Sequence, residues 1–220
     1  MNLDLFDHPD FHPHWREELA PGAVVLRGGA LKDDSALLAE IDRIAGLVPF
    51  QYRATPGGYA MSVAMTNCGD VGWVTDRQGY RYQATSPENQ QPWPAMPELF
   101  YALAVDAAEQ AGFPDFQPDA CLINRYQPGA KMSLHQDKDE HDFGAPIVSV
   151  SLGLPAIFQF GGMDRSDKTQ RVALTHGDIV VWGGPSRLRY HGILPLKTGE
   201  HPLTGQYRFN LTFRKAGSQG

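Results

Sequence analysis

The stretch AIFQFGGMDRSDKTQRVALTHGDIVVWGG, residues 156–184, decides the fold. It contains three short, mostly apolar runs, each of which ends at glycines or at polar and charged residues. Such runs are typical of β-strands joined by tight turns. Similar runs precede and follow the stretch, and they read CLINRY, IVSVSLGL, RLRYHGI and RFNLTFR. Strands this short and this closely spaced predict a sandwich, a barrel or a jelly roll rather than parallel βαβ units.

The first half of the chain adds two helices and a hairpin region. Residues 33–48 and 97–111 each carry an apolar stripe of helical period and predict helices. Between them, residues 57–83 predict short strands broken at glycine-containing turns, as in consecutive β-hairpins. We therefore expect a mostly β (α+β) fold, two helices followed by hairpins and a jelly roll, in a single domain over residues 1–220.

Composition sets broad limits on the kind of protein. Hydrophobic residues make up 42% of the chain and charged residues 20%, an ordinary globular profile. No apolar run is long enough to span a membrane, and the acidic, His-rich N-terminus does not resemble a secretory signal. The two cysteines, Cys68 and Cys121, form no CxxC pair, so we expect a reducing, cytoplasmic location. The net charge of −6 argues against a protein that coats nucleic acid nonspecifically.

Residues 134–142, LHQDKDEHD, follow a strand-like run and contain an HxD spacing. This spacing is weak alone, because roughly one HxD or HxE is expected by chance at this composition. The chain has two more, His8-Pro9-Asp10 in a Pro-rich terminal segment and His176-Gly177-Asp178 between two predicted strands. We interpret the first as part of a tail and the second as turn chemistry. Residues 140–142 are predicted to be a solvated, charged loop.

A site of two histidines and one carboxylate needs a further histidine that the tertiary structure delivers. His191 follows Asp137 by 54 residues, and four strands fit between them. From His176 the same histidine is only 15 residues away, across one short hairpin. The spacing therefore favours His135, Asp137 and His191 as metal ligands.

The run RFNLTFR, residues 208–214, gives an independent signal, because its polar and apolar residues alternate without a fault. Arg208, Asn210, Thr212 and Arg214 share one face. A solvent-exposed face is one explanation, but guanidinium groups also bind carboxylates in a bidentate manner and keep their charge when buried. Two arginines and an amide facing a metal imply a small dianionic co-substrate. Asn124 and Tyr126 share a face of CLINRY and are candidates for the same pocket.

These residues resemble the AlkB family of Fe(II)- and 2-oxoglutarate-dependent dioxygenases. The resemblance extends from about Thr55 to Arg214 and includes no departure at a position that matters. It is carried by the segments TPGGYAMSVAMTNCG, NRYQPGAKMSLHQDKDE, SVSLGLPAIFQFGG, HGDIVVWGGPSRLRYHGI and RFNLTFR. HxD with a distant histidine is shared by many dioxygenases, whereas the closing Arg-x-Asn-x-x-x-Arg strand is much more specific.

The resemblance implies a double-stranded β-helix, or jelly roll, at about 120–214, with hairpins at about 55–85 that form a nucleotide-recognition lid. Residues 1–30 would be an N-terminal extension. It implies Fe(II) on His135, Asp137 and His191. It implies that the co-substrate 2-oxoglutarate is held by Asn124, Tyr126, Arg208, Asn210 and Arg214. It implies substrate contacts from Met65, Trp73, Tyr80, Asp139 and Arg165. Without the resemblance, a structural aromatic residue in a hairpin is the favoured interpretation of Trp73, and Met65 either lies at the floor of the base pocket or fills the core.

The implied activity is oxidative demethylation of 1-methyladenine and 3-methylcytosine in DNA, and also in RNA, with O2 as second co-substrate and release of formaldehyde. Given the negative net charge, we expect modest affinity for nucleic acid and a preference for flexible single strands, whose bases are easily unstacked. We also expect a monomer. A hydroxylase of small molecules or protein side chains remains an alternative, with the same iron and a different lid. A cupin-like binding module is a second alternative, which the arginine face of residues 208–214 disfavours.

Overall fold

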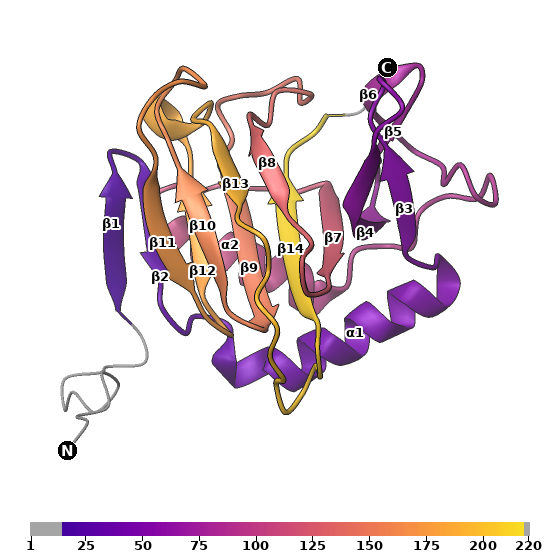
Figure 1. The fold of residues 1–220 in the computed structure, drawn as a ribbon, viewed down its shortest axis with the longest axis horizontal. Helices are drawn as coiled ribbons and strands as arrows, with labels where there is room; N and C mark the ends of the chain where they lie inside the picture. The colour runs from indigo at the N-terminus through magenta and orange to yellow at the C-terminus, as the bar shows by residue number, and fades with distance from the viewer. Residues whose placement is uncertain (1–14, 218–220) are drawn as a thin grey trace.

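The computed structural model describes residues 15–217, so the prediction for His8-Pro9-Asp10 lies outside the described residues. Two antiparallel sheets dominate the fold (Figure 1). The large sheet has, in spatial order, β1 (Arg16–Ala20), β2 (Ala23–Leu26), β12 (Ile179–Trp182), β9 (Ile147–Gly153), β14 (Arg208–Arg214), β7 (Ala120–Tyr126), β4 (Ala60–Gly69) and β3 (Gln51–Ala54). The small sheet has β11 (Gln170–Leu174), β10 (Ala156–Phe160), β13 (His191–Ile193) and β8 (Met132–His135). A separate hairpin pairs β5 (Gly72–Asp76) with β6 (Gly79–Gln83). This is the expected jelly roll.

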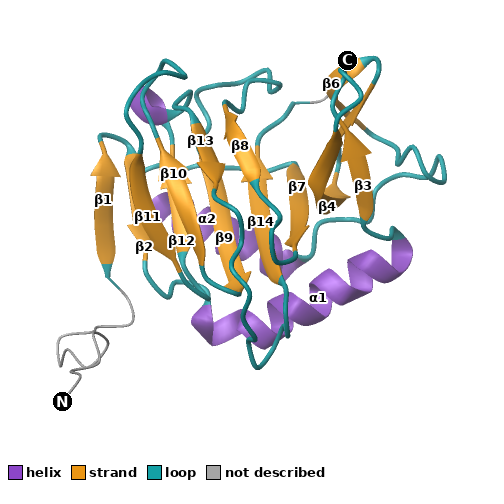
Figure 2. Cartoon of the chain, in the orientation of Figure 1, coloured by secondary structure: helices purple, strands orange, loops and turns teal. Residues whose placement is uncertain are grey.

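Both predicted helices are confirmed and cover one face of the large sheet. They are α1 (Asp34–Leu47) and α2 (Glu98–Gln110), and Figure 2 shows α1 across the lower ends of the strands and α2 behind them. Leu37 and Ile41 of α1 are fully buried in a cluster with apolar residues of α2, β9 and β14. Burial of this apolar stripe fixes which face of the large sheet is core. None of the described helices is long and apolar enough to cross a membrane.

Two strands near the N-terminus were not predicted. Residues 16–26, assigned from the sequence to an extension, form β1 and β2, and β2 pairs with β12 inside the large sheet. All four β2 residues are buried. The run is too short for its pattern to distinguish a buried strand from other apolar segments.

The predicted strand RLRYHGI is shortened to β13, His191–Ile193. Its first residues instead follow a 3-10 helix, η2 (Gly184–Ser186), and turn back so that the Arg187 side chain enters the interior. Arg187 is 3% exposed and donates to the carbonyl oxygens of Ala145 and Asp137. These bonds hold the segment in a turn, and regular pairing starts only at His191.

The alternation predicted for residues 208–214 is confirmed. Phe209, Leu211 and Phe213 belong to the cluster under the helices, whereas the polar residues between them line a cavity between the two sheets. The partner strand β7 is in register, with Asn124 opposite Asn210 and Tyr126 opposite Arg208. One face of β14 therefore builds the core and the other builds the site.

Candidate functional site

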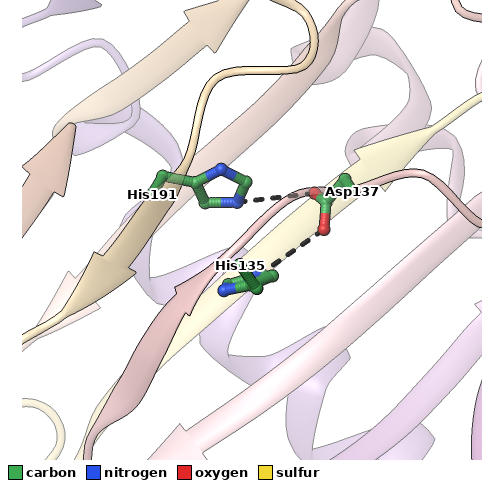
Figure 3. Close-up of side chains that lie close together, drawn as sticks. All are labelled: His135, Asp137 and His191. Carbon is green, nitrogen blue, oxygen red and sulfur yellow. Dashed lines mark ion pairs between the residues drawn. The ribbon is translucent and has the colours of Figure 1, made fainter. Parts of the chain in front are cut away.

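Strand pairing brings the three predicted metal ligands together. His135 ends β8 and His191 begins β13, and the two residues are direct partners in the small sheet. Asp137 follows β8 by two residues and turns its carboxylate toward both rings (Figure 3). Its Oδ1 lies 3.6 Å from His135 Nε2 and its Oδ2 lies 3.7 Å from His191 Nε2. One ligand atom from each residue lies within 4.8 Å of the others, which fits one divalent metal ion.

The backbone fixes which nitrogen of each imidazole faces the centre. His135 Nδ1 lies 2.8 Å from the carbonyl oxygen of Ser133, and His191 Nδ1 lies 3.0 Å from that of Arg189. A carbonyl only accepts hydrogen bonds, so each Nδ1 carries the proton and each Nε2 keeps its lone pair. Both rings are thus held in the tautomer that a metal requires. Burial, together with the neighbouring His135, lowers the pKa of His191 to about 4, which keeps this ligand neutral.

Arg214 orients the carboxylate of Asp137. Its Nη2 and Nε donate to Asp137 Oδ2 at 2.8 and 3.1 Å, and both side chains are buried. Burial alone would raise the pKa of Asp137, but the buried guanidinium of Arg214 outweighs this effect and holds the pKa well below its ordinary value. Asp137 is therefore a carboxylate whose Oδ2 is held by Arg214 and whose Oδ1 is left for a metal.

Beside the metal ligands, Arg208 offers an unused positive charge. Its side chain is 1% exposed, and Nη2 donates to Ser151 Oγ at 2.9 Å. Nε and Nη1 have no hydrogen-bond partner in the described part of the chain. Burial lowers the pKa of Arg208, although the adjacent Tyr126 opposes this effect. A buried guanidinium with two unpaired donors in a cavity fits a carboxylate-bearing ligand, because leaving such donors unpaired is costly.

The other predicted co-substrate residues line the same cavity but differ in which of their hydrogen-bonding groups lack a protein partner. Asn124 Oδ1 is buried without a partner among the described residues, whereas its Nδ2 donates to Asn210 Oδ1. Asn210 is fully used by the protein, since its Nδ2 donates to Ser149 Oγ and to the Val150 carbonyl and its Oδ1 also accepts from Thr212. Burial raises the pKa of Tyr126, which stays a neutral phenol. Arg208 and Asn124 are thus the groups most available to a ligand.

The β5–β6 hairpin places Trp73 and Tyr80 beside the loop that follows the metal ligands. Trp73 stacks on Tyr80, with ring centroids 5.6 Å apart, and its Nε1 donates to Asp139 Oδ2 at 2.9 Å. Met65 is 1% exposed and packs in the core of the jelly roll, so it does not line the cavity. Arg165 is exposed in the loop after β10, with its guanidinium 5.5 Å from the Tyr190 ring centroid.

Sequence reasoning missed a buried cluster behind Asp137. Glu140 was predicted to lie in a solvated loop, and this is wrong: it is 6% exposed and accepts from Tyr82 Oη at 2.6 Å. It also binds the guanidiniums of Arg187, at 3.1 Å, and Arg214, at 3.3 Å. A charged residue after an HxD motif carries no local signal that distinguishes burial from exposure, because its three partners come from distant segments.

The third HxD motif has a structural role, as predicted. His176 accepts from the Gly153 amide at Nδ1 and donates from Nε2 to Asp34 at the start of α1. Asp178 accepts from the amides of Gly28 and Thr175 and pairs with Arg27. These contacts join the turn before β12 to the N-terminal elements, away from the cavity.

Comparison with known proteins agrees with this geometry. The family model of the 2OG-Fe(II) oxygenase superfamily matches residues 22–214. The chain is 62% identical over 217 residues to the alpha-ketoglutarate-dependent dioxygenase AlkB of Escherichia coli K12, covering 99% of both chains. It is 28% identical over 223 residues to the DNA N(6)-methyladenine demethylase ALKBH1C of Arabidopsis thaliana, covering 90% of this chain and 49% of that one. The solved structure of OsALKBH1 superposes with a TM-score of 0.79 at 29% identity, covering 91% of this chain and all of the other.

Proposed function

The chain belongs to the 2OG-Fe(II) oxygenase superfamily and, within it, to the AlkB dioxygenases, and from this premise we propose that it oxidatively demethylates bases in nucleic acid. Its substrates are 1-methyladenine and 3-methylcytosine in DNA, and also in RNA. The observation that carries the proposal is the pairing of two features in one cavity: three metal donors with free lone pairs, and a buried Arg208 with two unpaired donors.

In this proposal His135, Asp137 and His191 hold Fe(II), and Arg208 binds one carboxylate of 2-oxoglutarate. Asn124 and Tyr126 add polar contacts, and Asn210 and Arg214 complete this wall of the cavity. When bound, the iron and 2-oxoglutarate supply the oxidation: one oxygen atom of O2 enters succinate as CO2 leaves, and the other hydroxylates the N-methyl group, which departs as formaldehyde. The protein's part is to point Nε2 of both imidazoles toward the metal and to keep Oδ1 of Asp137 facing it.

Trp73, Tyr80, Asp139 and Arg165 form the substrate side. The methylated base must leave its stack to reach the metal, so it needs aromatic faces to replace the lost stacking. The stacked Trp73 and Tyr80 provide such a surface, and the half-exposed His135 ring provides another. Met65 supports Trp73 indirectly, because Trp73 packs against the buried core cluster that contains Met65.

The same proposal includes a monomeric, cytoplasmic enzyme. The three metal donors and Arg208 lie together within one chain, which supports a site complete in the monomer. Cys68 and Cys121 are free and buried, which fits a reducing compartment. Sedimentation at micromolar concentration tests the monomer, and a dimer would contradict it.

The decisive experiment is formaldehyde release from a single-stranded oligonucleotide that carries one 1-methyladenine or one 3-methylcytosine. Release should require both Fe(II) and 2-oxoglutarate and should match the succinate formed. An unmethylated oligonucleotide of the same sequence is the control. Turnover on free small acids or on peptides, with none on the oligonucleotides, would instead identify a hydroxylase of another substrate class.

The His135→Ala, Asp137→Ala and His191→Ala variants should each lose turnover, because each removes one of three protein ligands. Circular dichroism should show a folded protein in each case. If one variant keeps full activity at ordinary iron concentration, that residue is not a ligand.

A further inference from the structure

One cross-strand pair of the β5–β6 hairpin contacts two consecutive acids of the metal loop. Trp73 and Tyr82 are direct partners in the hairpin, so their side chains lie on the same face. Trp73 Nε1 donates to Asp139 Oδ2, and Tyr82 Oη donates to Glu140 Oε1. The first contact is half-exposed, whereas Tyr82 and Glu140 are 5% and 6% exposed. The hairpin is therefore fastened to the metal loop at its buried side.

Behind Tyr82, Glu140 forms ion pairs with two buried guanidiniums. Its Oε2 lies 3.1 Å from Arg187 Nη2, and its Oε1 lies 3.3 Å from Arg214 Nε. Both arginines also hold Asp137: Arg214 donates to its carboxylate, and Arg187 donates to its backbone oxygen at 2.7 Å. Glu140 is thus linked to Asp137 at two points, to its carboxylate through Arg214 and to its backbone oxygen through Arg187.

These four side chains are electrically balanced. Arg187 and Arg214 contribute two positive charges, and Asp137 and Glu140 contribute two negative charges. The path from Glu140 through Arg214 Nε to Asp137 Oδ2 consists of contacts of 3.3 and 3.1 Å. A charge on Glu140 therefore lies within about 10 Å of a metal held by Asp137, and burial prevents solvent ions from screening it.

We propose that Glu140 is a positioning residue that balances the charge of Arg187 and Arg214 beside the metal and, through Tyr82, fastens the lid hairpin to the same cluster. This inference rests on the proposed metal site. Without the negative charge of Glu140, the cluster keeps a net positive charge that repels a divalent ion, and Arg214 is drawn entirely toward Asp137. The lid and the metal carboxylate would then lose their common support.

The first test is titration of the metal-free protein with Co²⁺, followed by the visible absorption of the bound ion, which needs no turnover. Glu140→Gln keeps the shape of the side chain and removes its charge, so Co²⁺ affinity should fall at least tenfold. Glu109→Gln, an exposed position on α2, is the matched control and should bind as the parent does. If the parent itself binds no Co²⁺, the metal site is wrong. If Glu140→Gln is folded and binds within twofold of the parent, only the present inference is wrong.

A second variant separates charge from simple support. Arg187→Gln removes a positive charge from the cluster, and the double variant Glu140→Gln/Arg187→Gln restores the balance. We expect the double variant to recover at least half of the logarithmic loss in Co²⁺ affinity seen in Glu140→Gln. A purely structural role predicts instead that the two losses add. If Glu140→Gln fails to fold, Arg187→Gln alone decides, since a tenfold loss of affinity in that variant would contradict the charge argument.

Tyr82→Phe tests the link to the lid. It removes only the hydroxyl that donates to Glu140, so Co²⁺ affinity should stay within about threefold of the parent. The KM for the methylated oligonucleotide should rise at least fivefold, with less than a twofold change in kcat at saturation. Tyr101→Phe, on α2, is the matched control. An unchanged KM in Tyr82→Phe would remove the lid from the proposal.

Discussion

At the scale of single residues, Arg208 shows that a side chain used for binding can lower the stability of the ligand-free protein. The side chain is buried, yet two of its donors have no partner among the described residues. An arginine kept this way destabilises the ligand-free protein, because desolvated donors lose their hydrogen bonds to water. The residue therefore makes physical sense only together with an anionic ligand that pairs with it.

Arg208→Lys should lower the apparent affinity for 2-oxoglutarate at least tenfold, about 1.4 kcal/mol. Lysine keeps a positive charge but lacks the planar guanidinium, whose Nε and Nη1 have no protein partner among the described residues. Co²⁺ affinity should hardly change, since Arg208 does not contact the metal ligands. The measurement is a 2-oxoglutarate titration at saturating metal. Superimposable curves for variant and parent would place the co-substrate elsewhere.

Asp139 should determine which bases are repaired. A methyl group at N1 of adenine or N3 of cytosine makes the base cationic, whereas one at N1 of guanine or N3 of thymine does not. The half-exposed carboxylate of Asp139 lies at the lid, where Trp73 Nε1 holds it at 2.9 Å. A cationic base that covers this carboxylate when it binds gains an ion pair of about 1–3 kcal/mol.

Asp139→Ala should therefore lose roughly five- to a hundred-fold in rate on 1-methyladenine and 3-methylcytosine, and little on 1-methylguanine and 3-methylthymine. The assay compares the four lesions in one oligonucleotide sequence. An equal loss on all four would mean that Asp139 acts only by holding Trp73, and no loss would mean that it does not touch the base.

Residues differ in how far the sequence reveals them. His135, Asp137 and His191 could be predicted, because a short motif and a strand count between distant positions restrict the choice. Glu140 and Arg187 could not, because each is a charged residue in a loop and its burial depends on partners 47 positions apart. Their positions follow from tertiary packing alone.

At the scale of elements, the β5–β6 hairpin depends on a close approach at its first residue. A Cβ added to Gly72 would lie 2.4 Å from Trp93 Cε2 and 2.8 Å from Asn67 Cβ. Asn67 also bonds the backbone of Trp73 in both directions, which ties the hairpin to β4. The bare backbone at Gly72 thus sets the position of the aromatic residues above the site.

Gly72→Ala should destabilise the protein by about 1–3 kcal/mol through overpacking, and it should raise the KM for the oligonucleotide as the hairpin shifts. Gly46→Ala is the control, and it should change the free energy of unfolding in the opposite direction. It lies in α1 with nothing within 4 Å of the added Cβ, so it should stabilise by about 0.5–1 kcal/mol. Urea unfolding measures both. A Gly72→Ala variant as stable as the parent would show that Trp93 moves aside freely.

Helices and strands whose apolar residues repeat with a regular period over many positions could be predicted from the sequence. The helices α1 and α2 and strand β14 match their predictions, because burial on one side leaves a repeated signal in the sequence. Strands β1 and β2 lack such a signal, since they are four or five residues long. The shortening of β13 reflects Arg187, whose inward side chain takes the backbone out of the sheet.

At the scale of the whole molecule, a net charge of −6 limits how the enzyme holds nucleic acid. Arg81, in the lid hairpin, is paired with Asp76, whose Oδ2 lies 2.8 Å from its Nη2. Few phosphates can therefore be neutralised, and binding should rely on the aromatic residues that receive the base. Flexible strands are favoured in that case, since unstacking a base from them is easy.

The affinity for a single-stranded methylated oligonucleotide should depend only modestly on salt, with a slope of log K against log[NaCl] of about −1 to −3, as for neutralisation of two to four phosphates. Fluorescence anisotropy over 50–300 mM NaCl, with Co²⁺ in place of iron, gives the slope. A slope steeper than about −5 would reveal an extended basic surface and contradict this picture.

The pairing of β14 with β7 and β9 restricts how this enzyme can change over generations. Inserting or deleting one residue in β14 would turn Arg208 and Asn210 toward the helices and send Phe209 and Leu211 into the cavity. Such an indel would disrupt catalysis and folding at once, with no neutral intermediate. A systematic scan of this strand should therefore recover substitutions on both faces and no change of length.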